Sequence, residues 1–496
     1  MSRDILRGDR LKRLTPESID YTASTSFDGI LVKPVVKINM AHMVMLINQG
    51  VVSRAEGSLC LKGLREMPEE LQLDPALEDV HMNVESFLVK KIGGTAGGQL
   101  NLAKSRNDQV ATAIRMALRE YLVNIVSGLT DLRKTILDQA SKHINTLMPG
   151  YTHLQHAQPT TLAHHFLAYH DALQRDSKRL IEAYGRVNLS PLGAVALAST
   201  GVKIDRAFTR RLLGFDGLLE NSIDAVSSRD FAIEVISDLA LAMTDLSKIA
   251  EEMVLWSSSE FSVMEISDGY ASTSSVMPQK KNAVVAELIR GKTSTVYGDL
   301  MASISMTKAL PYSYNIDLQQ LTPHIWSACS ITLTSIRVLK GMIQEAVFNK
   351  ERLKELLEEG AVAATDLADY LAVEHNIPFR TAHTVVGSLV RRSVEEKHAF
   401  RNVILEYLDG VTKDIAGVEV SITPSEVDRI LDPAKSVETR TVDGGPSSIV
   451  VKKMIVNRKK GVKETGEWAS QRIEMLEAAN QELARTTDEL IGGEKA

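Results

Sequence analysis

The segment Ser274–Asn282, SSVMPQKKN, combines residue types that could do acid–base chemistry. Two serines, a Met-Pro pair and a Lys-Lys-Asn run follow one another, and proline makes a helix interior implausible here. A serine hydroxyl is a poor base in water. It could take a proton only if a closing loop removed solvent, while nearby cations and backbone amides stabilised the alkoxide. Taken alone, the segment could also be a solvated basic loop.

Three other segments carry polar residues that could complete such a site. They are SRNDQ at 105–109, GYTHLQHAQPT at 150–160 and YNIDLQQ at 314–320. Each lies at or beside a predicted helix terminus or in a loop, where groups from distant parts of a chain can converge. Six of the twelve histidines lie between His143 and His170, so some are candidates for the core. No carboxylates accompany them at metal-ligand spacing, which disfavours a metal cluster.

Long helices must position these segments. No proline occurs between Pro75 and Pro149, Pro191 and Pro278, or Pro323 and Pro378. Apolar residues recur at alternating steps of four and three, which is typical of helices packed side by side. These residues are Leu118, Leu122, Ile125, Leu129, Leu132 and Ile136, then Ile236, Leu239, Met243, Leu246, Ala250 and Met253, and more loosely Leu162, Phe166, Tyr169 and Leu173.

Two further helices are predicted at about 283–308 and 323–344, which brings the central count to about five, each roughly 35 to 50 Å long. Such helices expose more apolar surface than one bundle covers, so bundles of several subunits are expected to pack together. We expect an N-terminal helical domain at 1–105, a central long-helix domain at 106–360 and a C-terminal helical domain at 361–496. A polar helix at about 464–490 closes the chain.

Composition excludes several classes of protein. The formal charge is −6, from 57 Lys+Arg and 63 Asp+Glu, so neither nucleic acid nor an anionic membrane is an expected partner. The polar start, MSRDILRGDRLKR, has no apolar signal-peptide core, and no apolar run of about 18 residues is evident. A cytoplasmic protein is expected. Cys60 and Cys329 are interpreted as buried, reduced thiols.

The segment SSVMPQKKN resembles the signature loop of the aspartase/fumarase superfamily, Gly-Ser-Ser-x-Met-Pro-x-Lys-x-Asn-Pro. Thr273 and Ala283 replace its terminal glycine and proline. Other segments resemble the argininosuccinate lyase branch, and the similarity runs from about residue 20 to 450. They are SRNDQVAT, GYTHLQHAQPT, EDVHMNVE at 78–85, SPLG at 190–193, ATDLADYL from 364 and PFRTAH ending at 383.

The resemblance implies an all-α fold of three domains and elimination of fumarate from an N-substituted aspartate, without metal or cofactor. It also implies a homotetramer whose central bundle has about twenty helices, with each active site built from three subunits. The expected ligands are small molecules, the N-substituted aspartate and fumarate.

The resemblance also implies roles for individual residues. Ser274 matches the catalytic base, His153 the general acid and Glu287 the acid that pairs with it. Lys280 and Asn282 match groups that hold the substrate carboxylate, and Arg106, Asn107 and Thr152 are of types that stabilise an aci-carboxylate. Ser24, Tyr314 and Gln319 match positions that bind the amine-side portion of the substrate.

Some positions depart from the family pattern. The family's usual His-Thr-Gly-Arg becomes Asn101-Leu102-Ala103-Lys104, a substrate-binding lysine becomes Thr322, and Pro34 replaces an acidic residue. Lys33, Lys37, Lys104 and Lys203 lie near segments that flank the amine-side pocket in the family. They suggest the hypothesis that this pocket prefers an additional carboxylate to a guanidinium.

Three readings are therefore open. The chain acts on argininosuccinate, or on another N-substituted aspartate such as the aminopolycarboxylate ethylenediamine-disuccinate, or it is a non-catalytic, crystallin-like structural protein. The presence of Ser274, His153, Lys280 and Asn282 disfavours the third reading.

Overall fold

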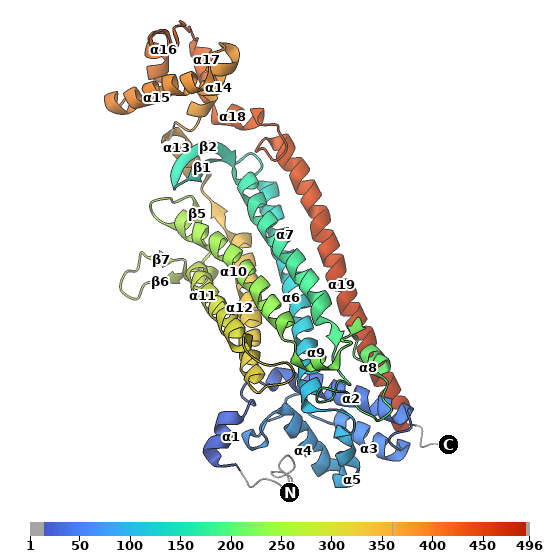
Figure 1. The fold of residues 1–496 in the computed structure, drawn as a ribbon. Coiled ribbons are helices and arrows are strands. Elements are labelled where there is room, and N and C mark those ends of the chain that lie inside the picture. The colour runs from blue at the N-terminus through green and yellow to red at the C-terminus, as the bar shows by residue number, and fades with distance from the viewer. Residues whose placement is uncertain (1–13, 360, 493–496) are drawn as a thin grey trace.

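Long helices dominate the computed structural model, which describes residues 14–359 and 361–492. Five of them form the bundle: α6 (Arg106–Lys142), α7 (Leu162–Val187), α10 (Asp230–Ser257), α11 (Val284–Thr307) and α12 (Asp317–Glu345) (Figure 1). The strands of the described residues form four two-stranded sheets. The predicted all-α fold class is confirmed.

Shorter elements close the lower end of the bundle in Figure 1. They are α1 (Pro16–Thr22), η1 (Gly29–Leu31), α2 (Val32–Asn48), α3 (Arg54–Arg65), η2 (Pro75–Leu77), α4 (Val80–Ile92), α5 (Gly94–Gly97) and η3 (Gly98–Asn101). Between the long helices α7 and α10 lie β3 (Leu189–Ser190), α8 (Arg206–Leu212), β4 (Gly217–Leu218) and α9 (Ser222–Ser227).

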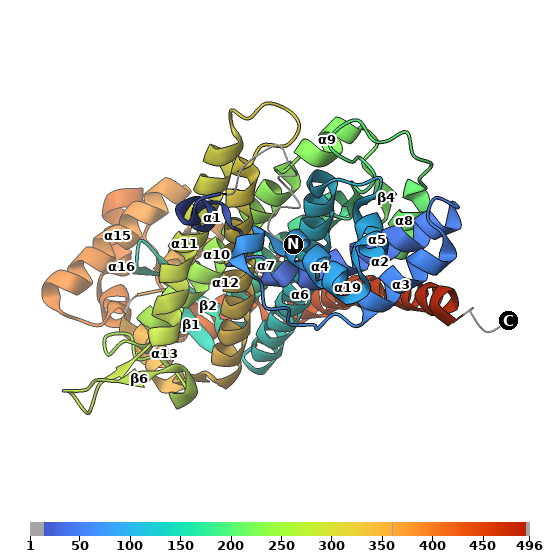
Figure 2. The same ribbon diagram turned by 90° about the horizontal axis from the view of Figure 1, so that it is seen from below.

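The other end carries a group of smaller helices, and those between residues 364 and 431 share a core of their own. They are α13 (Lys350–Glu359), α14 (Ala364–Glu374), α15 (Phe379–Glu396), α16 (Phe400–Ala416), α17 (Pro424–Leu431) and α18 (Pro433–Thr439). Figure 2, seen from below, shows α15 and α16 set to one side of the long helices. The N-terminal helices instead share one hydrophobic cluster with the bundle. The domain boundaries near 105 and 360 stay a prediction.

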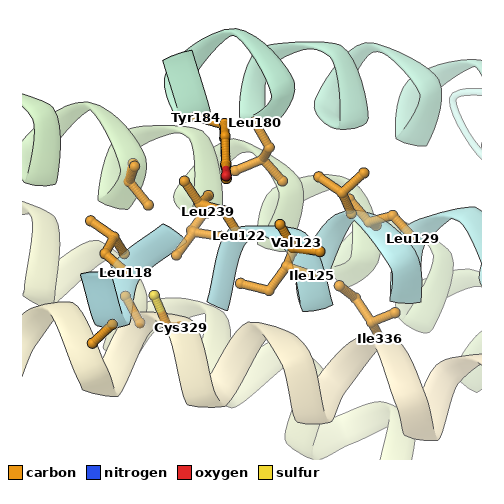
Figure 3. Close-up of a cluster of buried hydrophobic side chains, with 14 of the residues drawn as sticks. Leu118, Leu122, Val123, Ile125, Leu129, Leu180, Tyr184, Leu239, Cys329 and Ile336 are labelled. Atoms are coloured by element: carbon orange, nitrogen blue, oxygen red, sulfur yellow. The ribbon is translucent and has the colours of Figure 1, made fainter. Parts of the chain in front are cut away.

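The apolar repeat of α6 forms the centre of the bundle. Leu118, Leu122, Ile125 and Leu129 have no exposed surface. They face Leu180 and Tyr184 of α7, Leu239 of α10, and Cys329 and Ile336 of α12 (Figure 3). The repeat predicted from sequence is therefore the packing seam of the bundle. Cys60 and Cys329 are buried free thiols, as expected.

Two helix boundaries differ from the sequence-based expectation. Helix α12 begins at Asp317 and contains Pro323 in its interior, where proline removes one backbone hydrogen bond and crowds the carbonyl of Gln319. Helix α19 begins at Ser448, not near 464, and extends to Gly492. It packs along α6 and α7 and reaches α3 at the far end of the bundle (Figure 1).

One stretch of the described residues, Gly29–Asn48, is long and apolar enough by length and composition to cross a membrane. No such run was expected from the sequence. Most of the stretch is buried within the fold, as in the core helix of a soluble protein.

Replacing Leu122 with alanine is expected to lower the free energy of unfolding by about 2–5 kcal/mol, because the vacated volume is enclosed on all sides. Urea unfolding at a fixed protein concentration measures this loss. Met475→Ala, at a half-exposed position of α19, is the control and should change stability by no more than about 0.5 kcal/mol. Equal effects of the two variants would contradict the assignment of Leu122 to the core.

Candidate active site

A cavity of about 320 Å³ lies at the N-terminal end of the bundle. Four predicted substrate-binding residues line it: Ser24, Arg106, Tyr314 and Gln319. Ser24 lies in the loop after α1, and Arg106 is the first residue of α6. Tyr314 precedes α12, and Gln319 lies in its first turn. The side chain of Ser105 caps α6 and forms a capping box with Asp108, which fixes where Arg106 enters the cavity.

Acidic side chains dominate the charge of this cavity. Asp28, Glu78 and Asp79 line it together with Arg106. Arg106 pairs with Asp79 at 3.1 Å and with Glu78 at 3.4 Å. The hydroxyl of Ser24 donates to Asp28 Oδ2 at 2.6 Å. Burial raises the pKa of Asp28 to about 6, although the hydrogen bonds from Ser24 and from the Val80 N–H oppose the shift.

These three carboxylates were not among the residues predicted from the sequence. Glu78 and Asp79 begin the EDVHMNVE segment, but they were used only for the resemblance. The available signal was the position of Asp79 as the N-cap of α4, where its carboxylate accepts from the Met82 N–H at 2.9 Å. Nothing in the local sequence indicated that Asp28 would join them by accepting a hydrogen bond from the N–H of Val80, 52 positions further along the chain.

The second group of predicted residues lies on a hairpin at the other end of the bundle (Figure 1). Strands β1 (Leu147–Thr152) and β2 (Gln155–Thr161) pair antiparallel, with His153 and Leu154 between them. Both turn residues have positive φ, 56° and 58°, which is the backbone of a two-residue type I′ turn. The side chains of Thr152 and His153 are exposed at the hairpin tip.

The third group lies on the loop between β6 (Ser272–Thr273) and β7 (Lys281–Asn282), which projects from the side of the bundle (Figure 1). The oxygen of Ser274 accepts hydrogen bonds from the N–H groups of Val276 and Met277, at 3.2 and 3.1 Å. Two such donors stabilise negative charge on a serine oxygen. The loop thus supplies part of the environment that a serine base requires.

The two lysines of this loop have different surroundings. Lys281 binds Asp268 at 2.7 Å and Glu265 at 3.1 Å, which ties the base of the loop to the preceding segment. Lys280 is exposed and forms no ion pair within the part of the chain that the structure describes. Of the two, Lys280 is therefore the cation available to a ligand.

One chain does not bring these three groups together. Figure 1 shows the start of α6, the β6–β7 loop and the β1–β2 hairpin at separate levels along the bundle, and the cavity lies at the start of α6. Glu287 is exposed in the first turn of α11, and among the described residues it forms no hydrogen bond with His153. Asn107 lies beside Arg106, but its side chain donates to the Ala196 carbonyl at 3.1 Å and does not line the cavity.

The four lysines proposed to flank the amine-side pocket do not line the cavity. Lys33 pairs with Glu69 at 2.8 Å on the surface, and Lys203 is exposed. Lys104 is buried against the side-chain oxygen of Asn39, and burial lowers its pKa to about 7. Burial also lowers the pKa of Lys37. Thr322, the position of the missing family lysine, does line the cavity.

Long helices form the bundle, and the polar groups lie at its helix ends and on the β6–β7 loop with Ser274. This arrangement is that of a lyase of the aspartase/fumarase superfamily. Comparison with family models supports this class: a model described as Lyase matches residues 19–298, and one described as Argininosuccinate lyase C-terminal matches residues 361–438. The chain belongs to the argininosuccinate lyase family.

Comparison with individual proteins supports the same family. The argininosuccinate lyase of Methanocaldococcus jannaschii is 45% identical over 457 residues, which is 91% of this chain and 93% of that protein. That of Methanothrix thermoacetophila is 43% identical over 98% of this chain and 99% of its own. Among solved structures, EDDS lyase in complex with formate superposes with a TM-score of 0.88 at 29% identity, covering 99% of this chain and 98% of that one.

Proposed function

We propose that this lyase cleaves argininosuccinate into fumarate and arginine. The observation that carries the proposal is the charge of the cavity, where Asp28, Glu78 and Asp79 face a single arginine. A guanidinium is always cationic and matches carboxylates in bidentate pairs. The residues matched to the amine side, Ser24, Tyr314 and Gln319, line this same acidic cavity.

In the proposed mechanism, the Ser274 oxygen takes a proton from the carbon next to a carboxylate of the succinyl group. The electron pair left on that carbon moves into the carboxylate, which becomes an aci-carboxylate. Lys280, Asn282, Arg106, Asn107 and Thr152 stabilise its charge. The C–N bond then breaks, fumarate forms, and His153, supported by Glu287, gives a proton to the departing guanidinium nitrogen.

We also propose that the active unit is a homotetramer with shared active sites, because one chain holds the reacting groups apart. The outer surfaces of α10 and α11 expose large apolar residues, namely Leu241, Leu288, Tyr297, Met301 and Ile304. Such a patch is typical of a surface that packs against another subunit. A cytoplasmic location is part of this proposal.

A second substrate class follows from the structural similarity to EDDS lyase. The kcat/KM for argininosuccinate and for ethylenediamine-disuccinate, both followed by the ultraviolet absorbance of fumarate, decides between them. We expect argininosuccinate to be preferred, with no effect of Lys33→Ala or Lys203→Ala on that preference. Preference for the diamine substrate would overturn the proposed leaving group.

Replacing Asp79 with asparagine is expected to lower kcat/KM for argininosuccinate about 10- to 150-fold, because a charge-assisted hydrogen bond contributes about 1.5–3 kcal/mol. Asparagine caps a helix as well as aspartate does, so the variant removes the charge and keeps the start of α4. Asp74→Asn is the matched control, since Asp74 caps η2 through the Ala76 N–H but does not line the cavity. Equal losses in both variants would point to a structural effect.

A further inference from the structure

A hollow of about 570 Å³ lies where the end of α6, the start of α13 and the start of α19 meet. Four lysines from these three helices line it: Lys142, Lys350, Lys354 and Lys452. Glu351 is its one acidic lining residue, so four positive charges and one negative charge leave +3. The candidate active site uses none of these residues.

These lysines are not paired with carboxylates within the described ranges 14–359 and 361–492. None of the four forms an ion pair or a side-chain hydrogen bond there. Neighbouring lysines do: Lys453 pairs with Asp443 at 3.1 Å, and Lys340 pairs with Asp131 at 3.3 Å. An adjacent hollow that shares Lys142 is lined by two aspartates as well. The uncompensated charge is therefore local to the first hollow.

The positive charge also affects a half-buried histidine that lies beside the hollow. His143 follows the last residue of α6 and packs edge-on against Phe348. Burial lowers its pKa, and the positive charges of Lys350 and Lys142 lower it further. The charges of Lys350, on α13, and Lys142, on α6, therefore both act on the imidazole of His143. In a chain whose formal charge is −6, such a concentration of like charge is stabilised by a bound anion.

We infer that this hollow binds a small polyanion with two or more phosphate groups. Lysine ammonium groups are compact point charges that suit phosphate oxygens, and four of them on three helices can reach separate phosphates of one ligand. The lysines surround a single hollow with an apolar floor of Ile144, Leu147 and Leu357. A small ligand fits this arrangement, whereas a nucleic-acid polymer needs an extended basic stripe.

The position of the hollow connects it to the hairpin. Leu147, in its floor, is the first residue of β1, and the hairpin tip with His153 lies about 20 Å further along the strand at roughly 3.3 Å per residue. A ligand in the hollow would thus join three helices at the base of the hairpin. An effect of this ligand on enzymatic turnover rests on the proposed function, whereas binding of the ligand to the hollow does not.

Calorimetric titration of the purified full-length protein with inorganic triphosphate at low ionic strength tests the inference. We expect saturable binding of one ligand per chain that weakens as salt is added. Lys350→Gln combined with Lys452→Gln should weaken binding at least about tenfold, and the same pair changed to arginine should restore it to within about threefold. Lys134→Gln is the matched control, because Lys134 is exposed on α6 and lines the adjacent hollow.

Titrations with triphosphate and with ATP distinguish recognition of phosphate groups alone from recognition of a nucleotide. Equal affinity for triphosphate and ATP indicates recognition of phosphates alone, and tighter ATP binding indicates that the apolar floor holds a base; both support the site. Absence of binding, affinity no higher than for sulfate, or an unchanged affinity in the double glutamine variant would overturn it. Because binding is measured directly, these outcomes are independent of whether argininosuccinate is the substrate.

Discussion

Replacing Ser274 with alanine is expected to lower kcat by a factor of about one thousand or more while the fold and the oligomer stay intact. The Ser274 oxygen accepts two backbone N–H groups, from Val276 and Met277, and alanine leaves no atom in that position to take the proton. Loss of a base costs several kcal/mol of transition-state stabilisation, and each 1.4 kcal/mol is about tenfold in rate. The fumarate assay at saturating substrate measures the loss.

Ser275→Ala is the matched control for this experiment. Ser275 is the neighbouring hydroxyl, it is exposed, and the structure gives its side chain no hydrogen bond among the described residues. We expect this variant to keep turnover within about threefold of the unchanged enzyme, since neutral surface changes have small effects. If Ser275→Ala were inactive and Ser274→Ala active, the base would have to be reassigned.

Mixing two inactive variants is expected to restore activity from near zero. Ser274 lies on the β6–β7 loop and His153 at the tip of the β1–β2 hairpin, which are separate parts of one chain (Figure 1), so the proposed chemistry requires them to come from different subunits. If Ser274→Ala and His153→Asn subunits exchange randomly at equal amounts, about a quarter of the sites contain both intact residues. The recovered kcat should approach that fraction of the unchanged enzyme.

Two controls make the mixing experiment decisive. Each variant exchanged with itself must stay inactive, and the same mixture kept under conditions without exchange must also stay inactive. Native mass spectrometry of tagged subunits shows whether hybrids have formed. Hybrids of verified composition that remain inactive would mean that each site is completed within one chain.

The sequence predicted the bundle well because helix packing leaves a periodic signal. All six repeat positions of α6 between Leu118 and Ile136 are buried. The residues at which helices begin were less predictable. Pro323 suggested a helix start, although α12 begins six residues earlier, and the polar surface of α19 concealed its first sixteen residues. A helix that lies on the outside of a bundle buries few residues, so its apolar signal is weak.

The candidate site was predictable only as far as its motifs extend. Segment matching identified Ser24, Arg106, Tyr314 and Gln319, which the fold gathers in one cavity. It did not identify Asp28 and Asp79 as partners, because their proximity depends on tertiary packing. Tertiary packing also decides where the four flanking lysines lie, and none of them lines the cavity. A sequence cannot show that Lys104 is buried or that Lys33 is neutralised by Glu69.

Helix α19 also has a consequence for the order in which the chain can fold. Its last turns contact α3, where Arg54 donates to the Glu489 carbonyl across 435 positions of the sequence and Ser58 donates to the Leu490 carbonyl. At roughly 5–20 residues per second, the ribosome needs about 20 to 90 s to make the intervening chain. From the completion of α7 until α19 is made, the outer grooves of α6 and α7 lack their covering helix. A nascent chain at this stage presents apolar surface, so it is the form on which a chaperone can act before α19 emerges and docks.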